Sequence, residues 1–251
     1  MTASFSGLSA NRLLSALSPR TQELLAPELE LLAVPAGYML YEPNATIDFV
    51  YFPETAVASM IRRMADGSGV EVGTIGHEGV VGGAVALGAI VTPTHCVIQV
   101  AGNVQRMTTA ALRASIALPR DDDDNGNPSL YALMLLYAQA LFEQCAQTAA
   151  CNRLHALEHR CARWLLMIHD RVDGDELLLT QEFLSYMLGV RRAGVTEACG
   201  TLMRAGLIRY RHGRITVTDR AGLEDAACEC FQVAIDAYDQ LLGASLASTA
   251  A

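Results

Sequence analysis

The spacing of apolar residues predicts two short helices near the C-terminal end of the chain. A cap-type residue, Thr180, precedes a run in which apolar residues recur at helical spacing up to Leu188, and Gly189 ends that run. A second helix is predicted from Arg191 to Ala205. Two helices joined by a short glycine-containing turn form the helix-turn-helix plan.

The second of these helices has two different faces. At 100° per residue, Val195, Ala198 and Leu202 share one face, and their apolar character predicts that this face packs into a core. The opposite face is thinly covered and open to a partner. It carries Arg192, Ala193, Thr196, Glu197 and Gly200.

Two β-prone runs follow, from Leu207 to Arg211 and from Arg214 to Val217, and we expect them to form a hairpin, or wing, joined at His212 and Gly213. From Gly189 to Arg214 the chain has six arginines and one acid, a local formal balance of +5, although the net charge of the whole chain is −9. This concentration favours an anionic partner, and DNA phosphate fits best. The alternative is an ordinary small α/β module whose arginines form a solvated face.

The pattern changes between Val34 and Met107, where short β-prone runs are broken by Gly, Pro, Asn or Asp about every 8 to 12 residues. That rhythm is typical of an antiparallel sandwich or barrel, whose interior could hold a small ligand. Two helix-like patterns precede it, from Asn11 to Leu17 and from Pro19 to Leu32, and we expect them to cover it like a lid. A further short helix is expected from Thr108 to Ala117.

A long helix is predicted from Ser129 to about Leu154, because glycine and proline are absent there and apolar residues recur at a spacing near three and a half residues. A second helix should run from about Leu157 to His169, and a third, interrupted at Gly222, from Arg220 to Leu242. We interpret the long helix as a dimer seam; the alternative is a core helix of a single domain. The residues expected in the seam are Leu130, Leu133, Met134, Tyr137, Leu141 and Thr148.

The composition describes a folded chain without a membrane span. Its 251 residues are 51% hydrophobic, yet the longest apolar runs fall short of the roughly 20 residues needed to cross a bilayer. No charged leader precedes an apolar segment at the N-terminus, so we expect a cytoplasmic protein without membrane contact. The last residues, 243–251, should fray.

An acidic run, Asp121–Asp124, partly resembles a calcium-binding loop. Asp121, Asp123, Asn125 and Gly126 fit positions 1, 3, 5 and 6 of such a loop, but Ala132 stands at position 12, where a bidentate Glu belongs. We therefore expect a solvated loop.

The seven cysteines are odd in number and scattered, which argues against a disulfide framework in a reducing compartment. Cys228 and Cys230 form a C-x-C pair that could hold a metal with His155, His159 or a second subunit, or could be two packed thiols. A C-x-C pair without a further nearby pair is a weak signal, so we expect no metal and no cofactor.

The order of a β-barrel, a long helix and a winged helix-turn-helix resembles the Crp/Fnr family of bacterial transcription regulators. The segment LTQEFLSYMLGVRRAGVTEACGTLMRAGLI is similar to the family's helix-turn-helix, and VGTIGHEGVVGGAVALG stands where the family has its ligand cassette. The resemblance implies an α+β fold. Its parts are an antiparallel jelly-roll barrel like a cyclic-nucleotide-binding domain (residues 1–127), a long dimerisation helix (128–156) and a C-terminal winged helix-turn-helix domain (157–251).

The resemblance also implies a homodimer that binds a two-fold symmetric operator in double-stranded DNA, usually under the control of a small effector, with RNA polymerase as a possible further partner. The expected DNA-binding residues are Thr180, Arg191, Arg192, Thr196, Glu197, Arg209, Arg211 and Arg214. Arg192 matches the first Arg of the family's base-reading pattern, whereas Ala193 and Glu197 replace the Glu and second Arg. We therefore expect the family's docking mode but a different operator sequence.

The ligand cassette departs from that of the cyclic-nucleotide-binding members. Gly79 and Gly82 fit the glycines, but Gly83 stands where those members have a Glu for the ribose hydroxyl, and Thr94-His95-Cys96 replaces the Arg-Ser-Ala at the cyclic phosphate. The expected pocket residues are Gly79, Gly82, Gly83, Thr94 and His95. Without a cation to neutralise a buried phosphate, we do not expect cyclic AMP as effector, although a cyclic-nucleotide-responsive regulator with an atypical pocket is the alternative.

Other classes of function have weaker support in the sequence. The iron–sulfur branch of the family uses an N-terminal cysteine cluster, which this chain lacks because its first cysteine is Cys96. An enzyme in the β domain would have to use His77 with Glu78, or His95 with Cys96, and adjacent side chains point to opposite sides of a strand. We therefore expect no catalysis. A protein-interaction module that has lost DNA binding is the third class.

Overall fold

The computed structural model describes residues 9–117 and 128–243, so the acidic run 121–124 and the last eight residues lie outside the described residues. The chain forms two compact units, one from residues 1–58 and 75–139 and the other from residues 59–74 and 140–251. Each unit has its own core, and the long helix contributes residues to both.

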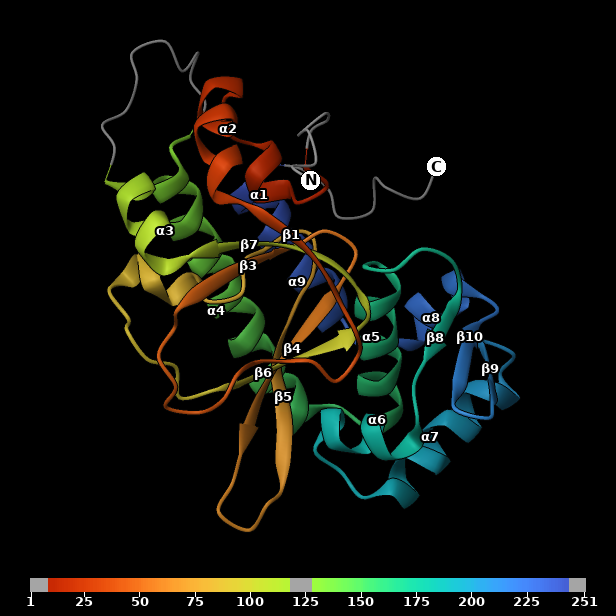
Figure 1. Cartoon of the computed structure of the whole chain (residues 1–251). Helices are drawn as coiled ribbons and strands as arrows, with labels where there is room; N and C mark the ends of the chain where they lie inside the picture. The colour runs from red at the N-terminus through yellow and green to blue at the C-terminus, as the bar shows by residue number, and fades with distance from the viewer. Residues whose placement is uncertain (1–8, 118–127, 244–251) are drawn as a thin grey trace. The chain divides into compact units, whose positions relative to one another are not determined.

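The first unit is built on antiparallel strands, as the sequence predicts. One sheet has the order β1-β7-β3 (Figure 1). In it Glu30 pairs with Arg106 and Val34 with Gly102. The other sheet has the order β2-β6-β4-β5 and is not confined to the first unit, because residues 59–74, which include most of β4 and β5, belong to the second. The strand bounds are β1 Glu30–Val34, β2 Met39–Tyr41, β3 Phe49–Pro53, β4 Val57–Arg63, β5 Gly69–Ile75, β6 His95–Val100 and β7 Gly102–Thr108. Side chains of the first unit such as Val50, Phe52 and Val104 are fully buried.

Short helices flank these strands. They are α1 Arg12–Ser15, α2 Pro19–Leu25, the 3-10 helices η1 Ala26–Glu28 and η2 Gly83–Leu87, and α3 Thr109–Ile116. The prediction of a helix up to Leu32 was wrong. Pro27 cannot donate a backbone hydrogen bond and its ring disfavours a continuing helix, and the following residues, from Glu30 on, pair with β7 instead.

The long helix α4, Leu130–Leu154, and the next helix α5, Leu157–His169, confirm the predicted elements. The predicted seam was wrong for most of its residues, because it selected the face of α4 that packs within the chain itself. Leu130, Leu133, Met134 and Tyr137 are at most 3% exposed, and Thr148 is buried as well, so their side chains are not available to a partner. Leu141 is half-buried. Among the described helices, none combines the length and the apolar character needed to cross a membrane.

The second unit ends in a small α/β module. Its elements are β8 Glu176–Leu178, α6 Gln181–Leu188, α7 Arg192–Arg204, β9 Ile208–Arg211, β10 Arg214–Val217, α8 Arg220–Ala226 and α9 Cys230–Leu242. The strands form an antiparallel sheet of order β8-β10-β9. The expected break at Gly222 was wrong. That glycine lies inside α8, where a side chain would overlap Leu207, and the chain instead leaves the helix at Ala227, which has an extended backbone.

Candidate nucleic-acid interface

Local signals in the sequence set the ends of α6. The hydroxyl oxygen of Thr180 accepts a hydrogen bond of 3.1 Å from the backbone N–H of Phe183, which caps the helix N-terminus. Gly189 ends the helix in the left-handed conformation with φ of +64°, which other residues rarely adopt. Thr180 thus has a structural task in addition to the DNA contact predicted for it.

Helix α7 has the two faces that its sequence predicts. Val195, Ala198 and Leu202 are at most 4% exposed. On the other face Arg192, Thr196 and their neighbour Glu197 are exposed, as are Arg191 and Ala193. The Thr196 hydroxyl lies 3.0 Å from the Gln181 Oε1 of α6 and 3.1 Å from the Arg192 carbonyl oxygen. The polar side chains of α7 are therefore accessible, with Arg192 in the first turn.

The wing is a two-residue hairpin between β9 and β10. His212 and Gly213 both have positive φ angles, +50° and +76°, as the primed turns of tight hairpins require. Arg209 and Arg211 are exposed on β9. Arg214 is also exposed, but its guanidinium forms an ion pair with the Glu176 carboxylate of β8.

Arg160 of α5 contacts the turn between α6 and α7, and the sequence pattern did not predict this contact. Its side chain is buried, and its Nη2 donates a hydrogen bond of 2.6 Å to the carbonyl oxygen of Leu188. Its Nε donates to the Asn152 Oδ1 of α4 at 3.1 Å. The carbonyl at the C-terminal end of a helix needs such a partner because no later residue of the helix donates to it. Arg160 thus joins the helix-turn-helix to the end of α4.

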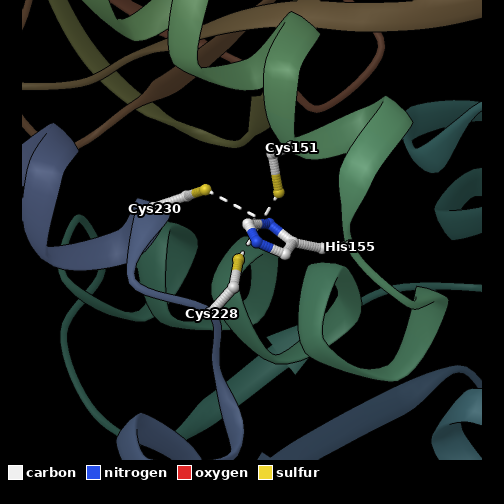
Figure 2. A group of neighbouring side chains, drawn as sticks. All are labelled: Cys151, His155, Cys228 and Cys230. Carbon is white, nitrogen blue, oxygen red and sulfur yellow. Dashed lines mark hydrogen bonds between the residues drawn. The ribbon is translucent and has the colours of Figure 1, made fainter.

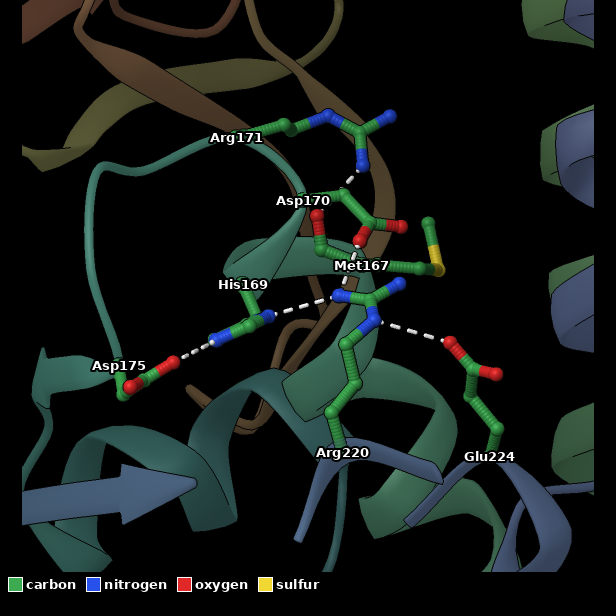
Figure 3. A network of polar contacts seen from close by, with 7 residues as sticks. All are labelled: Met167, His169, Asp170, Arg171, Asp175, Arg220 and Glu224. Carbon is green, nitrogen blue, oxygen red and sulfur yellow. Dashed lines mark hydrogen bonds and ion pairs between the residues drawn. The ribbon is translucent and has the colours of Figure 1, made fainter. Parts of the chain in front are cut away.

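A second polar network fixes the loop that leads into β8, and Figure 3 shows it from close by. The guanidinium of Arg220 lies 2.6 Å from the Asp170 carboxylate, 2.9 Å from the Glu224 carboxylate and 2.7 Å from the Nδ1 of His169. His169 Nε2 in turn lies 2.9 Å from Asp175. The network ties the start of α8 to both ends of residues 169–175, which precede the wing sheet.

The predicted pocket residues lie in the first unit, and its own aromatic rings fill the space beside their glycines. A side chain at Gly79 would overlap the ring of Tyr137, and one at Gly82 would overlap the hydroxyl of Tyr41. A side chain at Gly83 would also contact Tyr137. Because these glycines have no side chains, the rings of Tyr41 and Tyr137 fit beside them. The glycines therefore do not indicate a bound ligand.

The strand side of the predicted pocket also offers no cation for a phosphate. His95 is buried, and its Nδ1 lies 3.2 Å from the Glu42 carboxylate, whereas the backbone N–H of Thr94 donates to the Thr92 hydroxyl at 3.2 Å. No arginine is buried among residues 9–58, 75–117 and 128–139. Glu78, one of the residues that an enzyme in the β domain would need, is buried, and its Oε1 accepts from the backbone N–H of Gly76.

The C-x-C pair has partners that its sequence pattern identified only in part. Cys228 and Cys230 lie together with His155 and Cys151, whose side-chain donor atoms are all within 4.8 Å of one another (Figure 2). His159 does not belong to this cluster, and its Nδ1 instead forms a hydrogen bond with the carbonyl oxygen of Ala226. The missed signal is the C-x3-H spacing of Cys151 and His155, which places both on one side of a helix, one turn apart.

Comparison with known proteins supports this description. Residues 159–226 match the family of Crp-like helix-turn-helix domains. A search of curated protein sequences found no match.

Several solved structures share the fold. FixK2 from Bradyrhizobium japonicum is 14% identical, with 80% of this chain and 98% of that chain covered and a TM-score of 0.65. TTHB099, a transcriptional regulator of the CRP family from Thermus thermophilus, is 15% identical over 86% of this chain and 100% of its own, with a TM-score of 0.61. TTHA1359, a CRP/FNR-family regulator from the same organism, is 19% identical over 79% and 98%, also with a TM-score of 0.61.

The strands, the long helix and the winged module therefore have the fold of these solved Crp/Fnr-type structures. Within this fold, residues 159–226 are similar to Crp-like helix-turn-helix domains.

Proposed function

We propose that this chain acts as a homodimer that binds a two-fold symmetric operator in double-stranded DNA and reads its sequence through α7. The observation that carries the proposal is the exposed polar face of α7, with Arg192 in its first turn, on a helix whose opposite face is buried. A recognition helix of this kind lies in the major groove with its N-terminal residues at the base edges. Arg192 would pair bidentately with a guanine.

The other exposed polar residues would support this contact. Thr196, one turn further, would contact a base or a phosphate, and Glu197 would accept from a cytosine amine or orient Arg192. Arg191, Thr180 and the wing residues Arg209, Arg211 and Arg214 would contact phosphates, which position the protein without reading sequence. Arg214 would have to exchange its ion pair with Glu176 for a phosphate.

We place the dimer seam on the exposed face of α4. Apolar residues recur there in steps of three, four or seven, as in a coiled coil. They are Tyr131, Leu135, Ala138, Phe142 and Ala149. The side chains of Phe142, Tyr131 and Leu135 are 65%, 43% and 37% exposed in the protomer, so a second copy would remove a large apolar area from water.

Two half-sites should lie about 34 Å apart, because a two-fold dimer presents its two recognition helices to successive major grooves. The test is a selection of bound sequences from a random DNA pool by the wild type and by Arg192→Ala. We expect a palindromic consensus for the wild type and relaxed preference at one base pair of each half-site for the variant. The loss should be roughly 1 to 3 kcal/mol per half-site.

Arg211→Ala is the matched control, because it removes an exposed arginine from the wing. It should weaken binding to all sequences alike and reduce the dependence on salt. Identical consensus sequences for the wild type and Arg192→Ala would contradict base reading by Arg192. Regulation that persists in Arg192→Ala without DNA binding would favour a protein-interaction module instead.

A further inference from the structure

The last turn of α4 and the start of α9 bring four metal-binding side chains into one cluster within the second unit. Cys151 lies in the last turn of α4 and His155 directly follows that helix, whereas Cys228 precedes α9 and Cys230 is its first residue (Figure 2). The Sγ atoms of Cys151 and Cys228 are 3.4 Å apart, and Cys230 Sγ lies 3.4 Å from His155 Nδ1. All four donor atoms lie within 4.8 Å of one another. From this geometry we propose that Cys151, His155, Cys228 and Cys230 bind one zinc ion.

The donor types and their separations suit this ion. Three thiolates and one imidazole form a regular set for structural zinc, with Zn–S bonds of about 2.3 Å and Zn–N bonds of about 2.0 Å. A regular tetrahedron with such bonds has edges of about 3.5 to 3.8 Å. The two separations of 3.4 Å are close to these edges, so the donors can enclose one ion without a rearrangement of the backbone.

Polar neighbours orient two of the four ligands. His155 Nε2 lies 3.3 Å from the Glu229 carboxylate, which leaves Nδ1 facing the sulfur atoms. A carboxylate on the far nitrogen is the usual way in which a protein fixes the tautomer of a metal-binding histidine. The side-chain amide of Gln147 donates a hydrogen bond of 3.0 Å to Cys230 Sγ, and thiolates bound to a metal accept such bonds.

The charge of the occupied site is also compensated. Three thiolates with Zn²⁺ carry a net charge of −1, which is unfavourable in a buried place unless cations are near. The guanidinium groups of Arg160 and Arg163 both interact electrostatically with Cys151. Two of the three sulfur ligands, Cys151 and Cys230, are fully buried, which suits a closed structural site rather than an open catalytic one.

Other occupants fit less well. An iron–sulfur cluster with several irons would need its ligands further apart, because each iron takes its own protein ligand, whereas these donors converge on one point. Hard cations such as Mg²⁺ and Ca²⁺ prefer oxygen ligands, and the four donors offer none.

The ion would link the end of α4 to the start of α9 through ligands such as Cys151 and Cys228, which are 77 residues apart in the chain. Asn152, the residue after Cys151, is the partner of Arg160, which in turn holds the Leu188 carbonyl at the helix-turn-helix. Occupation of the site should therefore stabilise the end of α4 at the point where that helix is connected to the DNA-binding elements.

The experiment uses the full chain, purified without oxygen and with a phosphine reductant. Its zinc content is measured by mass spectrometry of the elements, and the chelated protein is titrated with Co²⁺. We expect one zinc per chain as isolated, and one Co²⁺ per chain with the thiolate charge-transfer absorption and strong visible bands of a tetrahedral sulfur site. A chain without zinc that also gives no such absorption would overturn the proposal.

Variants then identify the ligands. Cys228→Ser and His155→Ala should lose stoichiometric binding, whereas Cys145→Ser and His159→Ala, which change the same residue types outside the cluster, should retain it. Equal spectra for Cys228→Ser and the wild type would contradict the assignment.

One further variant tests the site at an exposed position, where the substitution should not disturb folding. Glu229→Gln changes a side chain that is 74% exposed, so its fold should survive, and its affinity for Co²⁺ should fall about 10- to 100-fold. Unchanged affinity in this variant, or a Cys151–Cys228 disulfide in place of bound metal under reducing conditions, would count against the site. Metal content and absorption do not depend on DNA, so this result is independent of the proposed operator binding.

Discussion

The guanidinium of Arg160 donates a 2.6 Å hydrogen bond to the carbonyl oxygen of Leu188, the last residue of α6. Arg160 is buried, and it also donates to Asn152 at the end of α4. The side chain of Arg160 therefore connects the turn of the helix-turn-helix to the long helix.

Arg160→Met should lower the free energy of unfolding by about 2 kcal/mol, because it leaves a buried carbonyl and an amide oxygen without their charged donor. Backbone hydrogen exchange at the α6–α7 turn should become faster. Arg153→Met, which removes an exposed arginine from α4, is the control and should change neither quantity. Unchanged unfolding and exchange in Arg160→Met would show that the contact does not hold the turn.

Arg220 should matter for stability more than Arg214, although both form ion pairs. The Asp170 side chain beneath Arg220 is only 5% exposed, whereas Arg214 and Glu176 are both more than half exposed. Arg220→Met leaves a buried carboxylate without its cation and should cost about 3 kcal/mol. Arg214→Met should cost at most about 1 kcal/mol. Urea denaturation of the two variants measures the difference, and equal losses would contradict the role given to burial.

Glu71 should make stability depend on pH. Burial raises the pKa of its carboxyl to about 7. The carboxylate accepts a 2.8 Å hydrogen bond from Trp164 and a hydrogen bond from Thr74, and these bonds lower the pKa, as do the charges of Arg163 and Arg171, but burial has the largest effect. The folded chain then holds a proton that the unfolded chain releases at a lower pH. Stability contributed by this group is therefore present at low pH and falls as the pH rises from about 4.5 to about 7, by up to about 3 kcal/mol.

Glu71→Gln tests this effect, because glutamine can accept from Trp164 but does not titrate. The free energy of unfolding of the wild type, measured relative to the variant, should decrease between pH 5 and pH 7 and then level off. A constant difference across that range would mean that Glu71 is ionised in the folded protein throughout.

The choice of seam on α4 predicts two different outcomes for two substitutions. Phe142→Glu should give a folded monomer of 26.9 kDa with weak operator binding, because it places a charge in the proposed seam. Leu133→Glu should instead unfold the protomer, since Leu133 is 3% exposed within it.

Light scattering with circular dichroism separates these outcomes. Leu87→Glu, at a side chain that is 63% exposed and far from α4 in the sequence, is the control and should remain dimeric. A wild type that is monomeric at micromolar concentration would remove the basis for the proposal.

Cyclic nucleotides should not bind in the micromolar range. The described part of the first unit has no buried arginine for the phosphate, and Tyr137 and Tyr41 occupy the space beside the cassette glycines. Titration calorimetry with cyclic AMP and cyclic GMP checks this, followed by operator affinity with and without each nucleotide. Saturable micromolar binding would mean that the barrel rearranges to admit the ligand.

The sequence by itself determined the elements whose signals are local. Thr180 and Gly189 set the ends of α6, His212 and Gly213 set the turn of the wing, and helical spacing separated the buried and exposed faces of α7. Each of these depends on backbone preferences and on residues within a few positions, so the order of letters contains the information.

Tertiary structure decided what depends on partners far along the chain. Glu30–Val34 is a strand because it pairs with β7, and the apolar residues all around α4 left its buried face undetermined until the protomer's own packing covered one side. Arg160 contacts Leu188, and Cys151 contacts Cys228, only after the segments that carry these residues have packed together. Local preferences cannot specify such contacts, because a side chain's partner depends on where the whole chain places it and not on its neighbours in sequence.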